Sequence, residues 1–195
     1  MLRKAPADGI ACRSNGEHVI STVWLRLSVA TMSELVDAAQ LARDPEARHW
    51  LGWGPETVVN PVAGGDQLAL RRSLLSFVGV QPSTGTVLVS INLTPRPDGS
   101  YEVGGIVDPE FRGRGYGKEA LDAVCRLAHQ HFGIVRLRAV CERTNTASQR
   151  WLAASGFERT DGAPQHVLPD GRVIESVWWT RTDFSARRCR NAPRR

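Results

Sequence analysis

The 195-residue sequence lacks any apolar run near the roughly 20 residues that a membrane-spanning helix needs. No apolar segment follows Arg3 and Lys4, so the start of the chain does not resemble a secretory signal. Disordered chains combine low apolar content with high net charge, whereas here 42% of the residues are hydrophobic and the net charge is +5. We therefore expect a folded, cytoplasmic protein with no membrane partner.

Cysteine is scarce and is not arranged for metal binding. The chain has four cysteines, none of them in a C-x-x-C pair or at zinc-finger spacing from a histidine. The H-E-x-x-H and EF-hand patterns are also missing. Cys125 falls on the apolar face of an expected helix and Cys141 ends an expected strand, so we predict that both are small core residues. We expect no metal site.

The positive charge is concentrated at the C-terminal end. Five arginines lie within residues 187–195, which contain no acidic residue, and the rest of the chain carries equal numbers of basic and acidic residues. A nucleic-acid-binding domain usually has a basic face, so the body of the chain does not predict a specific nucleic-acid partner. We interpret 185–195 as a solvated, disordered basic tail, and RNA binding through that tail is the alternative.

The order of the patterned segments predicts one α/β or α+β domain with a mixed sheet. We interpret 1–22 as an N-terminal extension, because glycine, asparagine, serine and charged residues occur there without a period, and 23–184 as the folded domain. The expected strands are 23–27, 77–81, 86–93, 101–107, 135–141 and 173–180, and the expected helices are 31–43, 44–52, 67–76, 115–132 and 145–155.

Some local signals are specific. Thr31 and Glu34 form a capping box, and Asp44 followed by Pro45 marks a second helix start. A pair of glycines, 104 and 105, stands inside the expected strand 101–107. Glycine within a strand indicates a bulge or a close approach by a ligand or another backbone segment.

The most informative motif is a glycine-rich loop between an expected strand and a long helix. Its residues are Arg112, Gly113, Arg114, Gly115, Tyr116, Gly117 and Lys118. Glycines let the backbone approach an anion, the helix start adds partial positive charge, and the basic side chains can add full charges. A Walker A loop and a dinucleotide-binding fingerprint are excluded, because their required glycines would fall on Arg112 and Lys118. The pattern R-x-x-G-x-G therefore predicts a phosphate-binding loop of another type.

This loop resembles the acetyl-CoA pyrophosphate loop of the GCN5-related N-acetyltransferase (GNAT) superfamily. A second element of that family follows, in which Asn145 and Ser148 open a helix that ends before Gly156 and Phe157. Residues 25–27, 50–53 and 170–172 are similar to the branch that acetylates the N-termini of ribosomal proteins. The resemblance covers about 23–184. It implies a mixed, mostly antiparallel central sheet of about six to seven strands, flanked by helices and splayed between its two central strands.

The resemblance implies acetyl-CoA as cosubstrate. The pyrophosphate would bind the backbone of 112–117, and the pantetheine arm would run along the strand that ends at Val107, with a bulge at the glycine pair. The amine of the second substrate would attack the thioester directly, so no cysteine nucleophile is implied. The implied coenzyme contacts are Ile106, Val107, Arg112, Gly113, Arg114, Gly115, Tyr116, Gly117, Lys118, Asn145 and Ser148.

The catalytic groups are marked less clearly. In some branches of the family a tyrosine seven residues after the helix asparagine protonates the leaving thiolate, and here that position is Leu152. Ser148, one turn after Asn145, is the candidate for that role, and the alternative is a hydroxyl that bonds its own helix backbone. Glu102 and His166 are candidate general bases, and each has the alternative of an ordinary surface or structural residue.

The expected acceptor is the α-amine of a protein N-terminus. Its pKa near ~7.7–8.0 leaves about a tenth neutral at pH 7, whereas a lysine side chain with a pKa near ~10.4 is almost fully charged. Trp50 and Trp53 are candidates to line the acceptor pocket, and helical spacing favours the core for Trp151. A small-amine acceptor (polyamine or aminoglycoside), a non-catalytic acyl-CoA-binding regulatory module, and a homodimer remain open.

Overall fold

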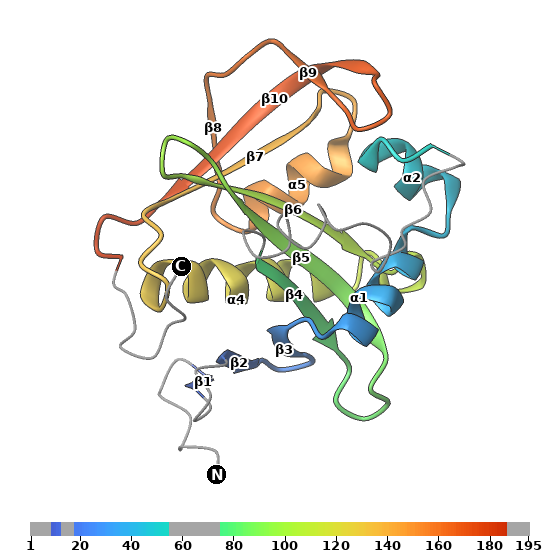
Figure 1. Cartoon of the computed structure of the whole chain (residues 1–195), viewed down its shortest axis with the longest axis vertical. Coiled ribbons are helices and arrows are strands. Elements are labelled where there is room, and N and C mark those ends of the chain that lie inside the picture. Colours follow the sequence, from blue (N-terminus) through green and yellow to red (C-terminus); the bar gives the residue numbers. More distant parts are fainter. Residues whose placement is uncertain (1–8, 13–17, 55–74, 187–195) are drawn as a thin grey trace.

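A computed structural model of the chain describes residues 9–12, 18–54 and 75–186 (Figure 1). Its described strands form one sheet in the order β1-β2-β3-β4-β5-β6-β7-β10-β8, and β9 pairs with β10. Among them only the β6–β7 pair is parallel. The strands are β1 (Ile10–Cys12), β2 (His18–Ser21), β3 (Arg26–Val29), β4 (Leu75–Val80), β5 (Val87–Pro95), β6 (Tyr101–Val107), β7 (Arg136–Glu142), β8 (Glu158–Thr160), β9 (Gln165–Val167) and β10 (Val173–Thr182).

The helices begin largely where their capping residues predict. The Thr31 hydroxyl accepts from the Glu34 N–H and the Glu34 carboxylate accepts from the Thr31 N–H, which confirms the capping box. The Asp44 side chain accepts from the Ala47 N–H at 2.8 Å. The described helices are α1 (Met32–Ala39), α2 (Pro45–Leu51), α4 (Tyr116–Gln130) and α5 (Thr146–Ala154), with the short 3-10 turns η1 (Gln40–Ala42) and η2 (Pro109–Phe111). None of them combines the length and apolar character that crossing a bilayer requires.

Helices cover both faces of the sheet (Figure 1). On one face the long helix α4 packs Leu121 and Leu127 against Phe77 and its neighbours. On the other face Leu41 of η1 packs with Val78, which alternates with Phe77 along β4. Cys125 and Cys141 are both buried in the core on the α4 side, as their positions in the sequence predict.

The sheet is splayed at its centre. β6 and β7 pair only at Tyr101 with Leu137 and at Glu102 with Arg138, although both strands continue beyond these residues. Past Glu102 the two strands therefore run without a shared ladder. This confirms the mixed, mostly antiparallel, centrally splayed sheet, and the ten described strands exceed the expected six to seven because several short strands lie toward its edges.

The sheet begins earlier in the chain than the sequence predicts. The sequence predicts an extension over 1–22, but His18–Ser21 pairs with both β1 and β3, and the side chains of Ile10 and Ile20 are fully buried. Strands of three and four residues are too short to display a period, and the apolar surface that holds them lies far away in sequence. His18, for example, packs edge-on against Phe132, two residues after the end of α4.

Two further predictions are corrected. Leu75 and Ser76 belong to β4 and not to a helix, because they pair in register with Leu93 and Asn92 of β5. The remainder of the predicted helix 67–76 and the tail from 187 onward lie outside the described residues.

The glycine pair in β6 makes no bulge against β5, because the β5–β6 register runs unbroken past it. The predicted close approach of another segment occurs at Gly105, where a Cβ atom would lie 2.8 Å from the Trp151 ring and 2.9 Å from the Ser90 carbonyl oxygen. A Cβ atom at Gly104 would meet nothing within 4 Å.

Candidate functional site

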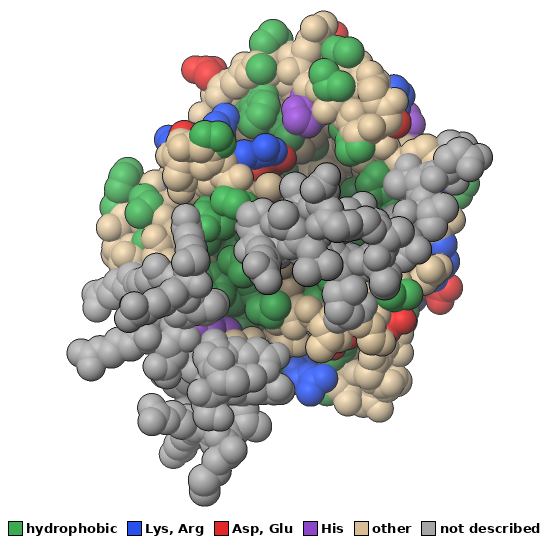
Figure 2. Space-filling model, viewed as in Figure 1, with side chains coloured by type: hydrophobic (Ala, Val, Ile, Leu, Met, Phe, Trp, Pro, Cys, Tyr) green, Lys and Arg blue, Asp and Glu red, His purple; other side chains and the backbone are tan. Residues whose placement is uncertain are grey.

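The gap between β6 and β7 opens into a cavity of about 520 Å³. This volume suits a small-molecule or cofactor site. Figure 2 shows a hollow in the described surface, with charged and histidine side chains near hydrophobic ones at its rim. The predicted site residues in the cavity wall are Trp50, Glu102, Ile106, Val107, Arg112, Gly113, Gly115, Gly117, Lys118, Asn145, Ser148 and His166.

Three predicted residues lie outside the cavity wall. Arg114 places its guanidinium over the Phe111 ring, 5.4 Å from the centroid. Tyr116 packs edge-on against the rings of Trp24 and Phe111. Trp53 follows the end of α2, where its N–H donates to the Arg48 carbonyl. Most residues of the glycine-rich loop thus line the cavity, together with Trp50, one of the two tryptophans predicted to line the acceptor pocket.

The splay frees one edge of β6. From Val103 to Val107 the strand pairs with β5, while β7 offers it no ladder partner. Backbone N–H and C=O groups need hydrogen-bond partners, and an extended ligand with amide groups can supply them. Gly104 leaves room for such a ligand, since nothing lies within 4 Å of where its Cβ would be. The edge of β6 therefore fits the amide-bearing pantetheine arm.

The glycine-rich loop leads into a helix with no capping side chain. The described α1, α2 and α5 begin with side-chain caps from Thr31, Asp44 and Asn145, whereas the N-cap residue of α4 is Gly115, with φ 90° and no side chain to cap the helix. The first N–H groups of a helix have no intrahelical acceptor, and the helix dipole is positive there. With Gly113 at φ 73°, the loop and the start of α4 present backbone donors to the cavity and fit a pyrophosphate.

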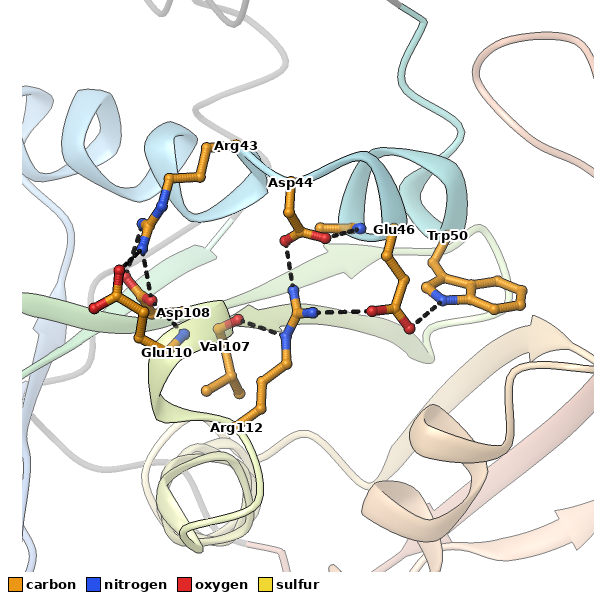
Figure 3. A network of polar contacts seen from close by, with 9 residues as sticks. Arg43, Asp44, Glu46, Trp50, Val107, Asp108, Glu110 and Arg112 are labelled. Atoms are coloured by element: carbon orange, nitrogen blue, oxygen red, sulfur yellow. Dashed lines mark hydrogen bonds and ion pairs between the residues drawn. The ribbon is translucent and has the colours of Figure 1, made fainter.

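Arg112 lines the cavity but directs its guanidinium at α2 (Figure 3). Its Nη2 donates to Asp44 Oδ2 at 2.9 Å, its Nη1 to Glu46 at 3.4 Å and its Nε to the Val107 carbonyl at 3.3 Å. Desolvation acts to raise the pKa of Asp44, but the Ala47 N–H and the charge of Arg112 outweigh it and lower this pKa. Two carboxylates thus share the charge of Arg112, which leaves anion binding mainly to the loop backbone.

A second arginine forms ion pairs beside those of Arg112, and the sequence did not predict them. Arg43, just after η1, donates from both terminal nitrogens to the buried carboxylate of Asp108, each at 3.0 Å, and also to Glu110. The hydrogen bond to Asp108, followed by its charge, raises the pKa of Arg43. Asp108 also accepts from the Glu110 N–H and so caps η2. The signal in the sequence was Asp108 before Pro109, the same cap pattern that precedes α2.

Asn145 and Ser148 meet at the start of α5. Asn145 is buried, and its side-chain oxygen accepts from the Ser148 N–H at 2.9 Å, so Asn145 caps its own helix. Ser148 is half-buried in the cavity wall. Leu152, at the position where the resemblance implies a tyrosine in some branches, is buried in the core. Trp151 packs against this core, as its spacing predicts, and its ring also borders the cavity beside Gly105.

The two candidate bases approach the cavity from different elements. Glu102, where β6 and β7 part, accepts from Arg96 Nε at 3.1 Å and from Arg96 Nη2 at 2.5 Å, both through Oε2. His166 on β9 packs edge-on against Trp178, with the ring centroids 6.0 Å apart. Both line the cavity, and Glu102 is already an ion-pair partner.

Glu142, the last residue of β7, also lines the cavity and was missed. Its Oε1 accepts from the Thr144 hydroxyl at 2.9 Å. Its Oε2 is buried and has no hydrogen-bond partner among the described residues. The signal in the sequence would have been an acidic residue at a strand end, three positions before Asn145.

Comparison with known families agrees with this geometry. A family model described as the acetyltransferase (GNAT) domain matches residues 25–158, well over half of the chain. The chain belongs to the GNAT acetyltransferase family. The matched region includes the splayed strands, the glycine-rich loop and the helix that carries Asn145 and Ser148.

The individual proteins that resemble this chain have low sequence identity to it. The uncharacterized N-acetyltransferase YnaD of Bacillus subtilis is 28% identical over 80 residues, and the match spans 41% of this chain but only 44% of YnaD. The crystal structure of a ribosomal-protein-S5-alanine acetyltransferase from Vibrio fischeri is 17% identical, with a TM-score of 0.68 over 87% of this chain and 98% of that one. RimL, a ribosomal L7/L12 α-N-protein acetyltransferase in complex with coenzyme A, is 18% identical, with a TM-score of 0.70 over 86% and 99%. At these identities the structures establish a common fold.

Proposed function

We propose that this protein transfers the acetyl group of acetyl-CoA to the N-terminal α-amine of a protein. The observation that carries the proposal is the cavity in the splay of β6 and β7, which runs into the uncapped start of α4. The backbone donors from Gly113 to Lys118 hold the pyrophosphate, and the free edge of β6 pairs with the pantetheine arm. The glycine at 104 keeps the path along β6 clear.

Acetyl-CoA supplies an activated thioester, and the chain supplies the alignment and the proton transfers. The amine nitrogen forms a bond to the acetyl carbon as the C–S bond breaks, and the thiolate that leaves collects a proton. Ser148, in the cavity wall, donates a hydrogen bond to that sulfur. Glu102 and His166 are the candidates to accept the proton that the amine loses.

The acceptor class rests on chemistry and on the nature of the structural neighbours. An α-amine is partly neutral near pH 7 and needs only a modest base, which suits a site whose Glu102 is held by Arg96. Two of the structural neighbours carry names that describe acetylation of ribosomal proteins, one of them at an α-amine. Trp50 of α2 gives the acceptor side of the cavity an apolar wall.

An acetylation screen tests the proposal. N-terminal peptides, polyamines and aminoglycosides are each incubated with protein and acetyl-CoA, and thiol release is followed together with the mass of the product. Acetylated peptides are the expected result. Acetylation of small amines alone would assign the acceptor to another class, and acetyl-CoA binding with no thiol release would indicate a binding module.

A matched pair of glycine variants tests the coenzyme loop by calorimetry. Gly113 and Gly85 both have positive φ, and an added Cβ at either meets nothing within 4 Å, so aspartate brings similar backbone strain at both. Only Gly113 lines the cavity. Gly113→Asp should abolish acetyl-CoA binding by placing a negative charge near the phosphates, while Gly85→Asp should bind as the wild type does. Equal affinity of the two variants would contradict the assignment of the loop.

A further inference from the structure

Most charged side chains of the cavity are already paired. Glu46 and Glu102 are each bound by an arginine, and Lys118 forms an ion pair with Asp122 at 2.5 Å. Glu142 differs from them, because its Oε2 is buried without a hydrogen-bond partner among the described residues. A buried carboxylate oxygen with no donor is unfavourable, so a ligand that donates a hydrogen bond there is favoured.

The charge of Glu142 determines which charge a ligand at this position should carry. A carboxylate repels the phosphates of a coenzyme and attracts a cation or an N–H donor. Its other oxygen, Oε1, accepts from Thr144, which fixes the orientation of the carboxylate. Glu142 therefore suits the amine partner of the reaction and not the coenzyme.

The strand register places Glu142 on the side of the sheet away from α4 and α5. Its neighbours in β7, Ala139 and Cys141, belong to the core that includes α4. Glu142 pairs with Ser176 of β10, and Val140 pairs with Trp178. Because side chains alternate along a strand, all four of these side chains lie on the same face of the sheet. Trp178 in turn contacts the ring of His166, so Glu142 and this candidate base share one face of the sheet.

A second hollow of about 330 Å³ adjoins the cavity at this point. Glu142 and Ile174 line both hollows, so the two share a wall. Beyond that wall the second hollow is bordered by Arg143 and Glu175, which form an exposed ion pair at 3.0 Å. A polar lining of this kind suits the backbone of a peptide.

We infer that Glu142 Oε2 binds the α-ammonium of the acceptor and that the second hollow receives the residues that follow it in the acceptor chain. The inference rests on the proposed function. The ammonium donates an N–H to Oε2 in the wall that the two hollows share, and it attacks the thioester after another of its protons has passed to Glu102 or His166. The acceptor chain then leaves past Ile174, beside Arg143 and Glu175. Glu142 is in this way a substrate-binding residue that selects a charged amine terminus.

The test compares Glu142→Gln with Glu158→Gln. Glu158 lies exposed on β8, outside both hollows, so it provides the same chemical change as a control. Peptide binding is measured by calorimetry with coenzyme A saturating the protein, because no transfer is then possible. We expect Glu142→Gln to weaken binding of the free-amine peptide roughly ten- to hundredfold, as for loss of a charge-assisted hydrogen bond. The Nα-acetylated peptide should bind the wild type and both variants equally.

Two further measurements separate binding from a structural role. The melting temperature of Glu142→Gln and its affinity for acetyl-CoA should not fall, because the variant removes a buried charge that the described residues do not pair. In acetylation assays, Glu142→Gln should raise KM for the peptide more than it lowers kcat. A lower melting temperature with equal loss of both peptides would mean that Glu142 is structural, and would overturn the inference.

Peptide length tests the second hollow without a mutation. Pentapeptides should be acetylated with a lower KM than dipeptides of the same first residues, because only the longer chains reach past Ile174. If peptides are acetylated but Glu142→Gln matches Glu158→Gln, or length has no effect, the inference fails while the proposed function stands. If the wild-type protein neither binds nor acetylates any peptide, both fail.

Discussion

The guanidinium of Arg112 in the glycine-rich loop donates a 2.9 Å hydrogen bond to Asp44, the residue that caps α2 (Figure 3). The loop is the predicted phosphate site, and α2 carries Trp50, which we propose borders the acceptor. One ion pair therefore links the glycine-rich loop to α2, and residues of both line the cavity. Arg43 makes a parallel link from the end of η1 to Asp108, at the end of β6.

Replacing Asp44 should destabilise the protein through two contacts at once. Asp44→Ala removes the cap on α2 and the partner of Arg112, and loss of a helix cap alone costs about 0.5–2 kcal/mol of the free energy of unfolding. Asp44→Asn keeps a capping oxygen and should cost less. Urea denaturation measures both variants. Glu46→Gln is the control, because Glu46 is more exposed and lies farther from Arg112, at 3.4 Å. A larger loss for Glu46→Gln than for Asp44→Ala would contradict this account.

The Asp44 contacts should also be visible in the pH dependence of stability. Because the pKa of Asp44 is lowered in the folded state, the unfolded chain takes up this proton first as the pH falls. The contribution is complete above the unfolded value of about 3.9 and is lost as the pH falls through the folded-state pKa. The difference in unfolding free energy between the wild type and Asp44→Asn should therefore be constant from near-neutral pH to about pH 5 and should shrink below about pH 4. A difference that grows on acidification would be incompatible with this sign.

The two adjacent glycines of β6 should respond in opposite ways. Gly105→Ala places a Cβ 2.8 Å from the Trp151 ring and 2.9 Å from a backbone oxygen, so it should lower the free energy of unfolding by about 1–3 kcal/mol. A Cβ at Gly104 meets nothing within 4 Å, so Gly104→Leu should leave the melting temperature nearly unchanged. Its side chain enters the space of the cavity, however, so acetyl transfer should fall at least about tenfold. Thermal denaturation and thiol release, measured on both variants, test the contrast, and full activity of Gly104→Leu would contradict it.

Ser148→Ala tests the proton supplied to the departing thiolate. The substitution keeps the backbone N–H that Asn145 uses to cap α5, so folding should be preserved. If the hydroxyl assists the leaving group, kcat and kcat/KM should fall together by roughly 10²–10⁴. Thr146→Ala, exposed on the same helix and outside the cavity wall, is the control. A higher KM for acetyl-CoA at unchanged kcat would instead make Ser148 a coenzyme contact only.

The two buried cysteines should be unreactive in the folded protein. Burial raises the pKa of the Cys125 thiol to about 12 and also raises that of Cys141. Only a thiolate reacts readily with a disulfide reagent. In a Cys12→Ser, Cys189→Ser background, such a reagent should label neither thiol at pH 8 in the native state and both after denaturation. Rapid labelling of the native protein would show that one of them is accessible.

Local signals account for what the sequence predicted well. The capping box at Thr31, the Asp44 cap and the R-x-x-G-x-G loop each lie within about one helical turn, where neighbouring residues alone set the backbone conformation. The motif with Asn145 also predicted the start of α5 and, by resemblance, the splayed sheet. These features concern the elements themselves and the backbone that a phosphate would contact.

Tertiary structure decided which side chains meet. The sequence by itself determined the glycine-rich loop and the helix starts, but Arg112 reaches Asp44 across 68 positions, and His18 of the short strand β2 packs against Phe132, far away in the sequence. The sequence places Glu142 at a strand end, but it does not predict that Oε2 is buried without a hydrogen-bond partner among the described residues, because that burial depends on where β7 diverges from β6. Hydrogen bonds within a turn are encoded by adjacent residues, whereas burial and ion pairing arise only when the folded sheet brings remote segments together.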